Sequence, residues 1–257
     1  MQPGAAASCG DVREFAAVSI SGNSIRVSGK LPPACDGTAS YVNVLDNDGY
    51  AGQSFAAIWQ MLGGEGPRGI AQGSTPPDAR QLVRLDSEPL PQALSDINKY
   101  SNNTMAQQLF LSLGAQFRTD ADGDDARAAQ RVVRQWLAKK GITAPHLVME
   151  NGSGLSRAER VSTREMAALL QAAWKSPYSA EFISSMPLVG MDGTMRKRLK
   201  RTAMTGEGHI KTGTLNTVRA IAGFSRDSNG HTWAVAAILN DPKPWGASQV
   251  LDQVLLD

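Results

Sequence analysis

The apolar runs near the C-terminus constrain the fold of this chain more than any other feature. HIKTGTL, VRAIAGFSR and HTWAVAAILN are short, apolar and bounded by turn residues, which is typical of β-strands. The turn DSNG joins the last two runs and predicts an antiparallel hairpin. The stretch ASQVLDQVLLD, which follows them, has the spacing of a helix. We therefore expect an antiparallel sheet followed by a helix at this end.

The middle of the chain has a helical period instead. Apolar residues recur at helical spacing in PQALSDINKYS, TMAQQLFLSLG and ARAAQRVVRQWLAKKG. The second of these helices is expected to end at Gly114, and Ser162 with Glu165 predicts a capping box at the start of a further helix. Helices in the middle and antiparallel strands at the end predict an α/β (α+β) layered fold.

The N-terminal segment has the pattern of a small β unit. Two strand-like runs are separated by a turn at Gly22 and Asn23. Cys9 and Cys35, the only two cysteines, flank these runs, so pairing of the strands could bring them together as a disulfide. A disulfide would place the protein in an oxidising compartment. Two unpaired, buried thiols are the alternative.

Composition argues against several classes of function. A net charge of +2 is too small to indicate a nucleic-acid partner, and a hydrophobic content of 42% suffices for a sizeable core. No run approaches the roughly 18 apolar residues of a membrane span. The basic run RKRLKR (196–201) fits the solvated face of a helix, with a phosphate-binding patch as the alternative. His146, His209 and His231 are too scattered for a metal site, and we expect no cofactor.

The triplet Lys211-Thr212-Gly213 interrupts the first of the C-terminal strands with polar and small residues. A lysine that faces a cleft supplies positive potential, and the Thr212 hydroxyl can bind a carboxylate. Gly213 allows the backbone of a ligand to approach the strand closely. The free N–H groups of this strand, that of Thr214 included, could pair with an extended substrate and donate to an oxyanion. The pattern is typical of one wall of an acyl-transfer site.

Ser101 and Asn103 lie where one predicted helix ends and the next begins. An exposed junction can direct a hydroxyl and an amide into a cleft. Ser101 could then relay a proton, and Asn103 could hold a substrate amide. The alternative is that Ser101 caps the second helix, and both roles can hold together.

A Ser-x-Asn at a helix junction followed by Lys-Thr-Gly on a late strand resembles the penicillin-binding proteins and serine β-lactamases. DINKYSNNTMAQQLF, NGSGLSR, MPLVGMDGTMRKRL and HIKTGTLNTVRAIAGF, in this order, are similar to the low-molecular-mass class C penicillin-binding proteins. These are D-alanyl-D-alanine carboxypeptidases and endopeptidases that trim peptidoglycan. SGKLPPAC is similar to the end of their inserted domains. Residues 1–40 would thus be a remnant of an inserted β domain, and 41–257 the C-terminal part of the catalytic domain.

The resemblance implies a transpeptidase-like fold and a serine-type, β-lactam-sensitive peptidase in the periplasm or another extracytoplasmic compartment. Its substrate would be a peptidoglycan stem peptide, cleaved at a D-Ala-D-Ala bond or a D-Ala cross-link through an acyl-enzyme. The implied roles are catalysis for Ser101, Asn103 and Lys211, and substrate binding for Thr212, Gly213 and Thr214.

The chain departs from the family at the nucleophile. The family's serine belongs to a Ser-x-x-Lys motif, in which a lysine one helical turn later takes its proton. No lysine in this sequence has a serine at that spacing; Thr194 with Lys197 comes closest, in a stretch that fits a surface helix. We therefore expect the nucleophile upstream of Met1, an incomplete domain that is inactive alone, and self-association through exposed strand edges. Asn151, in NGSGLS, lies where the family often has an acidic residue, so a role that depends on charge is in doubt. The alternative is that this stretch only forms a tight glycine turn at the end of a strand.

Two other interpretations remain at this point. The missing nucleophile would also suit a module that binds peptidoglycan without cleaving it. A relative of the β-lactamases would share the same motifs, but it would need a deacylating base that no motif in the sequence indicates.

Overall fold

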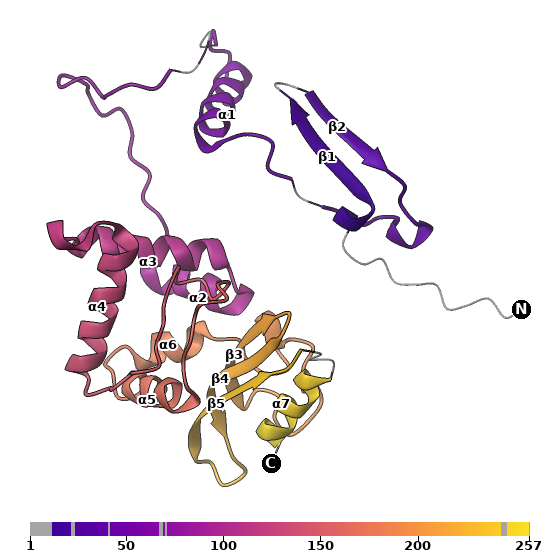
Figure 1. The fold of residues 1–257 in the computed structure, drawn as a ribbon, viewed down its shortest axis with the longest axis vertical. Coiled ribbons are helices and arrows are strands. Elements are labelled where there is room, and N and C mark those ends of the chain that lie inside the picture. Colours follow the sequence, from indigo (N-terminus) through magenta and orange to yellow (C-terminus); the bar gives the residue numbers. More distant parts are fainter. Residues whose placement is uncertain are drawn as a thin grey trace, which may run out of the picture. The chain divides into compact units, whose positions relative to one another are not determined.

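The computed structural model of the chain describes residues 12–21, 24–40, 42–66, 69, 71–242 and 246–256. They form two compact units that divide between Arg84 and Leu85. Figure 1 shows the elements of both units, coloured along the sequence. No helix in these ranges is both long and apolar enough to span a membrane.

The first unit contains a two-stranded antiparallel sheet and a helix. Its elements are η1 (Val12–Glu14), β1 (Ala16–Ser21), β2 (Ser24–Gly29), η2 (Pro33–Cys35) and α1 (Asn47–Met61). The pairing of β1 with β2 confirms the two predicted strands, although the turn at Gly22 and Asn23 lies outside the described residues. Cys35 is buried, but Cys9 also lies outside them, so the disulfide stays a prediction. The predicted boundary of the inserted domain near residue 40 also stays a prediction, because the division into compact units does not show which residues belong to an inserted domain.

The second unit combines helices with a three-stranded antiparallel sheet. Its helices are α2 (Leu90–Tyr100), α3 (Asn103–Phe117), α4 (Asp125–Lys139), α5 (Thr163–Trp174), α6 (Ser179–Ser185) and α7 (Ala247–Leu256), with 3-10 turns η3 (Asp120–Asp122) and η4 (Gly193–Met195). Its strands are β3 (Gly208–Leu215), β4 (Val218–Arg226) and β5 (Thr232–Asn240), in the order β3-β4-β5. The predicted α/β (α+β) fold with antiparallel C-terminal strands is confirmed, and so is the capping box of Ser162 and Glu165.

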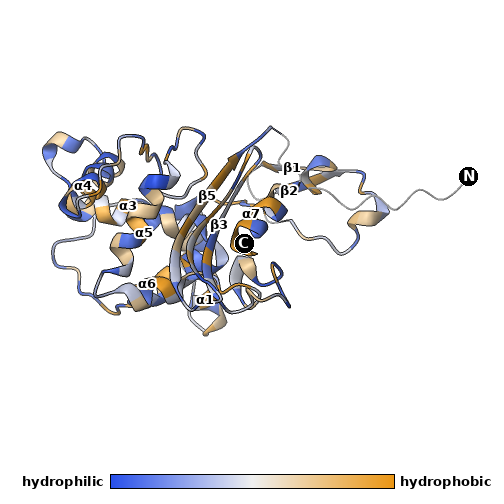
Figure 2. Cartoon of the chain, turned by 90° about the horizontal axis from the view of Figure 1, so that it is seen from below, coloured by the Kyte–Doolittle hydropathy of each residue, from blue (hydrophilic) through white to orange (hydrophobic). Residues whose placement is uncertain are grey.

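The sheet is covered on both faces. On one face, Ile221 of β4 packs with Leu251 of α7. On the other face, Phe224 of β4 packs with Leu170 of α5. Figure 1 shows α7 on one side of the sheet and α5 and α6 on the other, and Figure 2 shows hydrophobic residues along these strands. Because successive side chains of a strand point to opposite faces, the strand register also decides on which face Lys211 lies.

Gly114 does not end the helix in which it lies, contrary to the prediction. Helix α3 continues to Phe117, and Gly114 is buried where α3 meets α4. A Cβ atom on Gly114 would come within 1.8 Å of the carbonyl oxygen of Asp125. The glycine therefore allows two helices to pack closely, a tertiary role that a helix-ending pattern does not reveal.

The basic run at 196–201 is not helical, so this prediction is also wrong. It follows η4 as a series of turns, in which Leu199 and Arg201 have positive φ values of 52° and 65°. Met195, just before it, is fully buried, and Arg198 forms a 2.6 Å ion pair with Asp252 of α7. The predicted helix is thus absent, whereas the predicted exposure to solvent is found for every basic residue of the run except Arg198.

Candidate active site

Ser101 is the residue that turns the chain from α2 into α3. It has a left-handed conformation with φ 56° and ψ 46°, which costs a residue other than glycine about 1–3 kcal/mol. Asn102 caps α3 instead, since its side chain accepts a hydrogen bond from Met105 N–H at 3.1 Å. The alternative role of Ser101, as the cap of this helix, is therefore not found. The hydroxyl of Ser101 is left for another partner.

Lys211 lies on the face of the sheet that packs against α5. It pairs across the strands with Ala222, which packs beside Leu170 and Phe224. The Nζ atom of Lys211 donates to Ser101 Oγ at 2.5 Å. This contact joins residues that are 110 positions apart in the sequence, as expected if both belong to one site.

Burial lowers the pKa of the Lys211 ammonium below its ordinary value, because desolvation disfavours the charged form. Lys211 also donates to the carbonyl oxygen of Thr212 at 2.8 Å, which fixes the direction of the ammonium group. A serine hydroxyl that accepts from such an ammonium is well placed to take up and pass on a proton.

The outer edge of β3 is covered at its beginning and open afterwards. Ile210 N–H donates to the carbonyl oxygen of Pro187 at 2.8 Å. The N–H groups of Thr212 and Thr214 point to the same edge as that of Ile210, because N–H directions alternate along a strand. Within the described residues, the strand order places no further strand beside β3. An extended peptide could therefore pair with this part of the edge.

Thr194 belongs to the site, although its neighbours indicated only a surface helix. It lies in η4, and its Oγ1 atom is 2.8 Å from Oγ1 of Thr212. Spacing along the sequence could not reveal this contact, since it depends on how the segment before β3 wraps around that strand.

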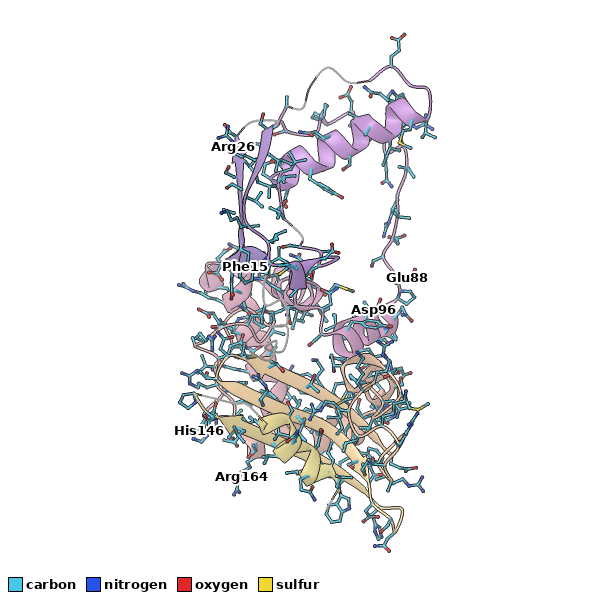
Figure 3. All side chains as sticks on the ribbon, turned by 90° about the vertical axis from the view of Figure 1, so that its right-hand side faces the viewer. Phe15, Arg26, Glu88, Asp96, His146 and Arg164 are labelled. Carbon is cyan, nitrogen blue, oxygen red and sulfur yellow. The ribbon has the colours of Figure 1, made fainter. Side chains whose placement is uncertain are left out.

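A cavity of about 1190 Å³ brings the predicted site residues together. Parts of α3, α5, β4 and the loop before α5 complete its wall, and Figure 3 labels Asp96 on α2 and Arg164 on α5 for orientation. No group of three or more metal-binding side chains occurs in the described part of the chain. The predicted site residues that line the cavity are Ser101, Asn103, Lys211, Thr212, Gly213 and Thr214.

The loop NGSGLS lines the same cavity, and its first residue holds a turn. Oδ1 of Asn151 accepts from Ser153 N–H at 2.9 Å and from Ser153 Oγ at 2.8 Å. Gly152 and Gly154 have positive φ values of 71° and 79°, which favour glycine. The glycine turn is confirmed, and the amide of Asn151 is sufficient to hold it without a negative charge.

Comparison with solved structures defines the class of protein. The fold is similar to that of penicillin binding protein 4 (dacB) from Haemophilus influenzae, solved in complex with a β-lactam. The TM-score is 0.72 and the identity 25%, over 89% of this chain and 52% of that one. Together with the Ser-x-Asn junction and the Lys-Thr-Gly strand, this similarity places the chain in the class of penicillin-binding proteins.

Sequence comparison then gives the family. Residues 2–254 match the D-Ala-D-Ala carboxypeptidase 3 (S13) family, and the chain belongs to this family. It is 28% identical over 237 residues to a D-alanyl-D-alanine carboxypeptidase of Actinomadura sp. strain R39. This alignment covers 85% of the chain and 44% of that protein. It is 27% identical over 199 residues to the D-alanyl-D-alanine carboxypeptidase DacB of Haemophilus influenzae, and this alignment covers 77% of the chain and 41% of that protein. The chain thus spans less than half the length of these two relatives.

Proposed function

We propose that this chain supplies the substrate-binding part of a serine-type D-Ala-D-Ala carboxypeptidase or endopeptidase that acts on peptidoglycan stem peptides outside the cytoplasm. The 2.5 Å contact between Lys211 Nζ and Ser101 Oγ carries the proposal, because it joins the Ser-x-Asn junction to the Lys-Thr-Gly strand. Membership of the S13 family supports the D-Ala-D-Ala substrate.

In the proposed mechanism, a serine hydroxyl adds to the carbonyl carbon of the scissile amide and loses its proton to a lysine. Ser101, held by Lys211, passes a proton to the leaving amine as the C–N bond breaks. Thr212 binds the terminal carboxylate, and Thr214 N–H donates to the oxyanion. Asn103 holds the substrate amide. Water then hydrolyses the acyl-enzyme and releases the shortened peptide.

The proposal requires a nucleophile that the Ser-x-x-Lys pattern does not provide within these 257 residues. We infer that a further segment of the complete protein brings this serine and its lysine into the cavity beside Ser101. The chain alone should then be inactive. The same arrangement makes β-lactams inhibitors of the complete protein, since their ring carbonyl would acylate the serine.

The test is release of D-alanine from a peptide that ends in D-Ala-D-Ala, measured with the complete protein. Ser101→Ala should lower kcat by about 10²- to 10⁴-fold, the usual contribution of a positioned proton-transfer group. Ser184→Ala, at an exposed serine of α6, is the control and should retain wild-type turnover. A folded complete protein that releases no D-alanine would show the proposal to be wrong.

A peptidoglycan-binding module without catalysis is the second candidate, and the missing Ser-x-x-Lys motif favours it. In that case this chain would bind a muropeptide stem noncovalently, and Thr212→Val would abolish the binding. Binding by the complete protein without any turnover would decide for the module and against the peptidase.

A further inference from the structure

The last turn of α2 is fastened to the connecting segment 186–195, which precedes β3. Lys99, two positions before Ser101, donates from Nζ to Asp192 Oδ2 at 2.5 Å. The same Nζ lies 3.3 Å from the carbonyl oxygen of Met186. The side chains of Lys99 and Asp192 are 19% and 41% exposed, so this ion pair is partly shielded from solvent.

Asp192 is held on both of its oxygens. While Oδ2 faces Lys99, Oδ1 accepts from Leu188 N–H at 2.7 Å. Burial opposes ionisation of this carboxyl, but the bonds from Lys99 and Leu188 outweigh it, so that the pKa of Asp192 lies below its ordinary value. The carboxylate therefore stays charged, and it fixes the shape of the connecting segment as well as the end of α2.

Gly193 brings the two backbones into direct contact. Its φ is 51°, and a Cβ atom on it would come within 2.5 Å of the carbonyl oxygen of Lys99. The next residue, Thr194, is the one whose hydroxyl meets Thr212 in the cavity. The connecting segment is also bound to β3, through the bond from Ile210 N–H to Pro187.

We propose that the Lys99–Asp192 ion pair positions Ser101 and Thr194 against β3 and so sets the contact between Ser101 and Lys211. Neither Lys99 nor Asp192 lines the cavity, so both act through their neighbours and are positioning residues. The inference rests on the proposed peptidase function, because it assigns a task to the pair within that same site.

A second ion pair of the same unit provides a matched control. Arg198 and Asp252 lie 2.6 Å apart with side-chain exposures of 21% and 20%, and they join the turns after η4 to α7. Neither residue lines the cavity. Loss of this pair should affect folding at least as much as loss of Lys99–Asp192, because Asp252 is less exposed than Asp192, but it should leave the geometry at Ser101 unchanged.

The experiment compares Lys99→Met and Asp192→Asn with Arg198→Met and Asp252→Asn in the complete protein. Each variant is characterised by its Tm, by the second-order rate of acylation by benzylpenicillin, and by kcat and KM for a D-Ala-D-Ala peptide. Asp192→Asn is the milder change, because the amide keeps an oxygen for Leu188 N–H. Lys99→Arg restores a cation and should recover part of the rate.

We expect substitutions in either ion pair to lower Tm. Only the Lys99 and Asp192 variants should lose about 10- to 100-fold in acylation rate and kcat, with KM nearly unchanged. Acylation at the wild-type rate in a folded Asp192→Asn variant would overturn the inference. A wild-type protein that is neither acylated nor active would refute the proposed function itself, which keeps the two failures distinct.

Discussion

At the scale of single residues, burial in the fold changes the pKa of Lys211. Burial lowers its pKa from the ordinary 10.5, whereas the unfolded chain keeps the ordinary value. In the pH range between these two values the unfolded state binds more protons, so stability rises with pH across that range. Below it the buried charge opposes folding in full.

We therefore expect Lys211→Met to raise the free energy of unfolding at about pH 7, and the gain to shrink as the pH rises toward about 10. Urea denaturation of both proteins at a series of pH values measures this. Lys140→Met, at an exposed lysine after α4, is the control for replacing a lysine by methionine. An Lys211→Met gain that is equal at every pH would contradict the assigned role of burial.

Two glycines of the sheet distinguish a role in binding from a role in folding. A Cβ on Gly213 would meet only Ala220 Cβ, at an ordinary 3.4 Å, whereas one on Gly223 would lie 2.0 Å from the carbonyl oxygen of His209. We expect Gly213→Ala to keep the wild-type Tm and to raise KM for the peptide, because the methyl group would project into the cavity that Gly213 lines. Gly223→Ala should instead lower Tm. If Gly213→Ala left KM unchanged, the peptide would not bind against this part of the cavity wall.

At the scale of elements, helices and strands with a clear period could be predicted from the sequence, whereas the connecting segment could not. Strand β4 and the capped helix α5 have strong local patterns, and both are found. The segment 186–195 has no such pattern, since its conformation depends on the contacts of Asp192 with Lys99 and Leu188. Thr194 was therefore missed as a site residue.

The close packing of α3 on α4 leads to a prediction for Gly114. Alanine has the higher helix propensity by up to about 1 kcal/mol, but its Cβ would lie 1.8 Å from a carbonyl oxygen of α4. We expect the clash to dominate, so that Gly114→Ala lowers the free energy of unfolding by about 1–3 kcal/mol. Ser112→Ala, on the exposed side of α3, should slightly raise it. Equal effects of the two changes in chemical denaturation would refute this view of the packing.

At the scale of the whole molecule, the order of the motifs predicted which residues lie together better than any single residue did. Ser101 and Lys211 lie in segments with separate local signals, and only the fold shows that their side chains touch. The ion pair of Lys99 and Asp192 could not be predicted from the sequence, because a contact between distant segments produces no periodic pattern in either segment. The sequence could not decide whether Ser101 also caps α3, since Asn102 suits that position equally well.

The edges of the sheet lead to a prediction about association. Strands β3 and β5 are the outer strands of the described sheet, and Trp233 of β5 is 59% exposed. Exposed edges and apolar side chains favour pairing between copies. We expect this chain, expressed alone, to form dimers or larger species in light scattering. A monomer at high concentration would contradict this expectation.

The most direct test of the central claim is the intact mass of the protein after incubation with excess benzylpenicillin. The claim is that Ser101, Lys211 and Thr212 form one part of a serine peptidase site whose nucleophile lies outside these residues. It predicts one covalent adduct on the complete protein and none on this chain when it is folded. An adduct on this chain, at Ser101 or Thr194 or at any other of its residues, would contradict it.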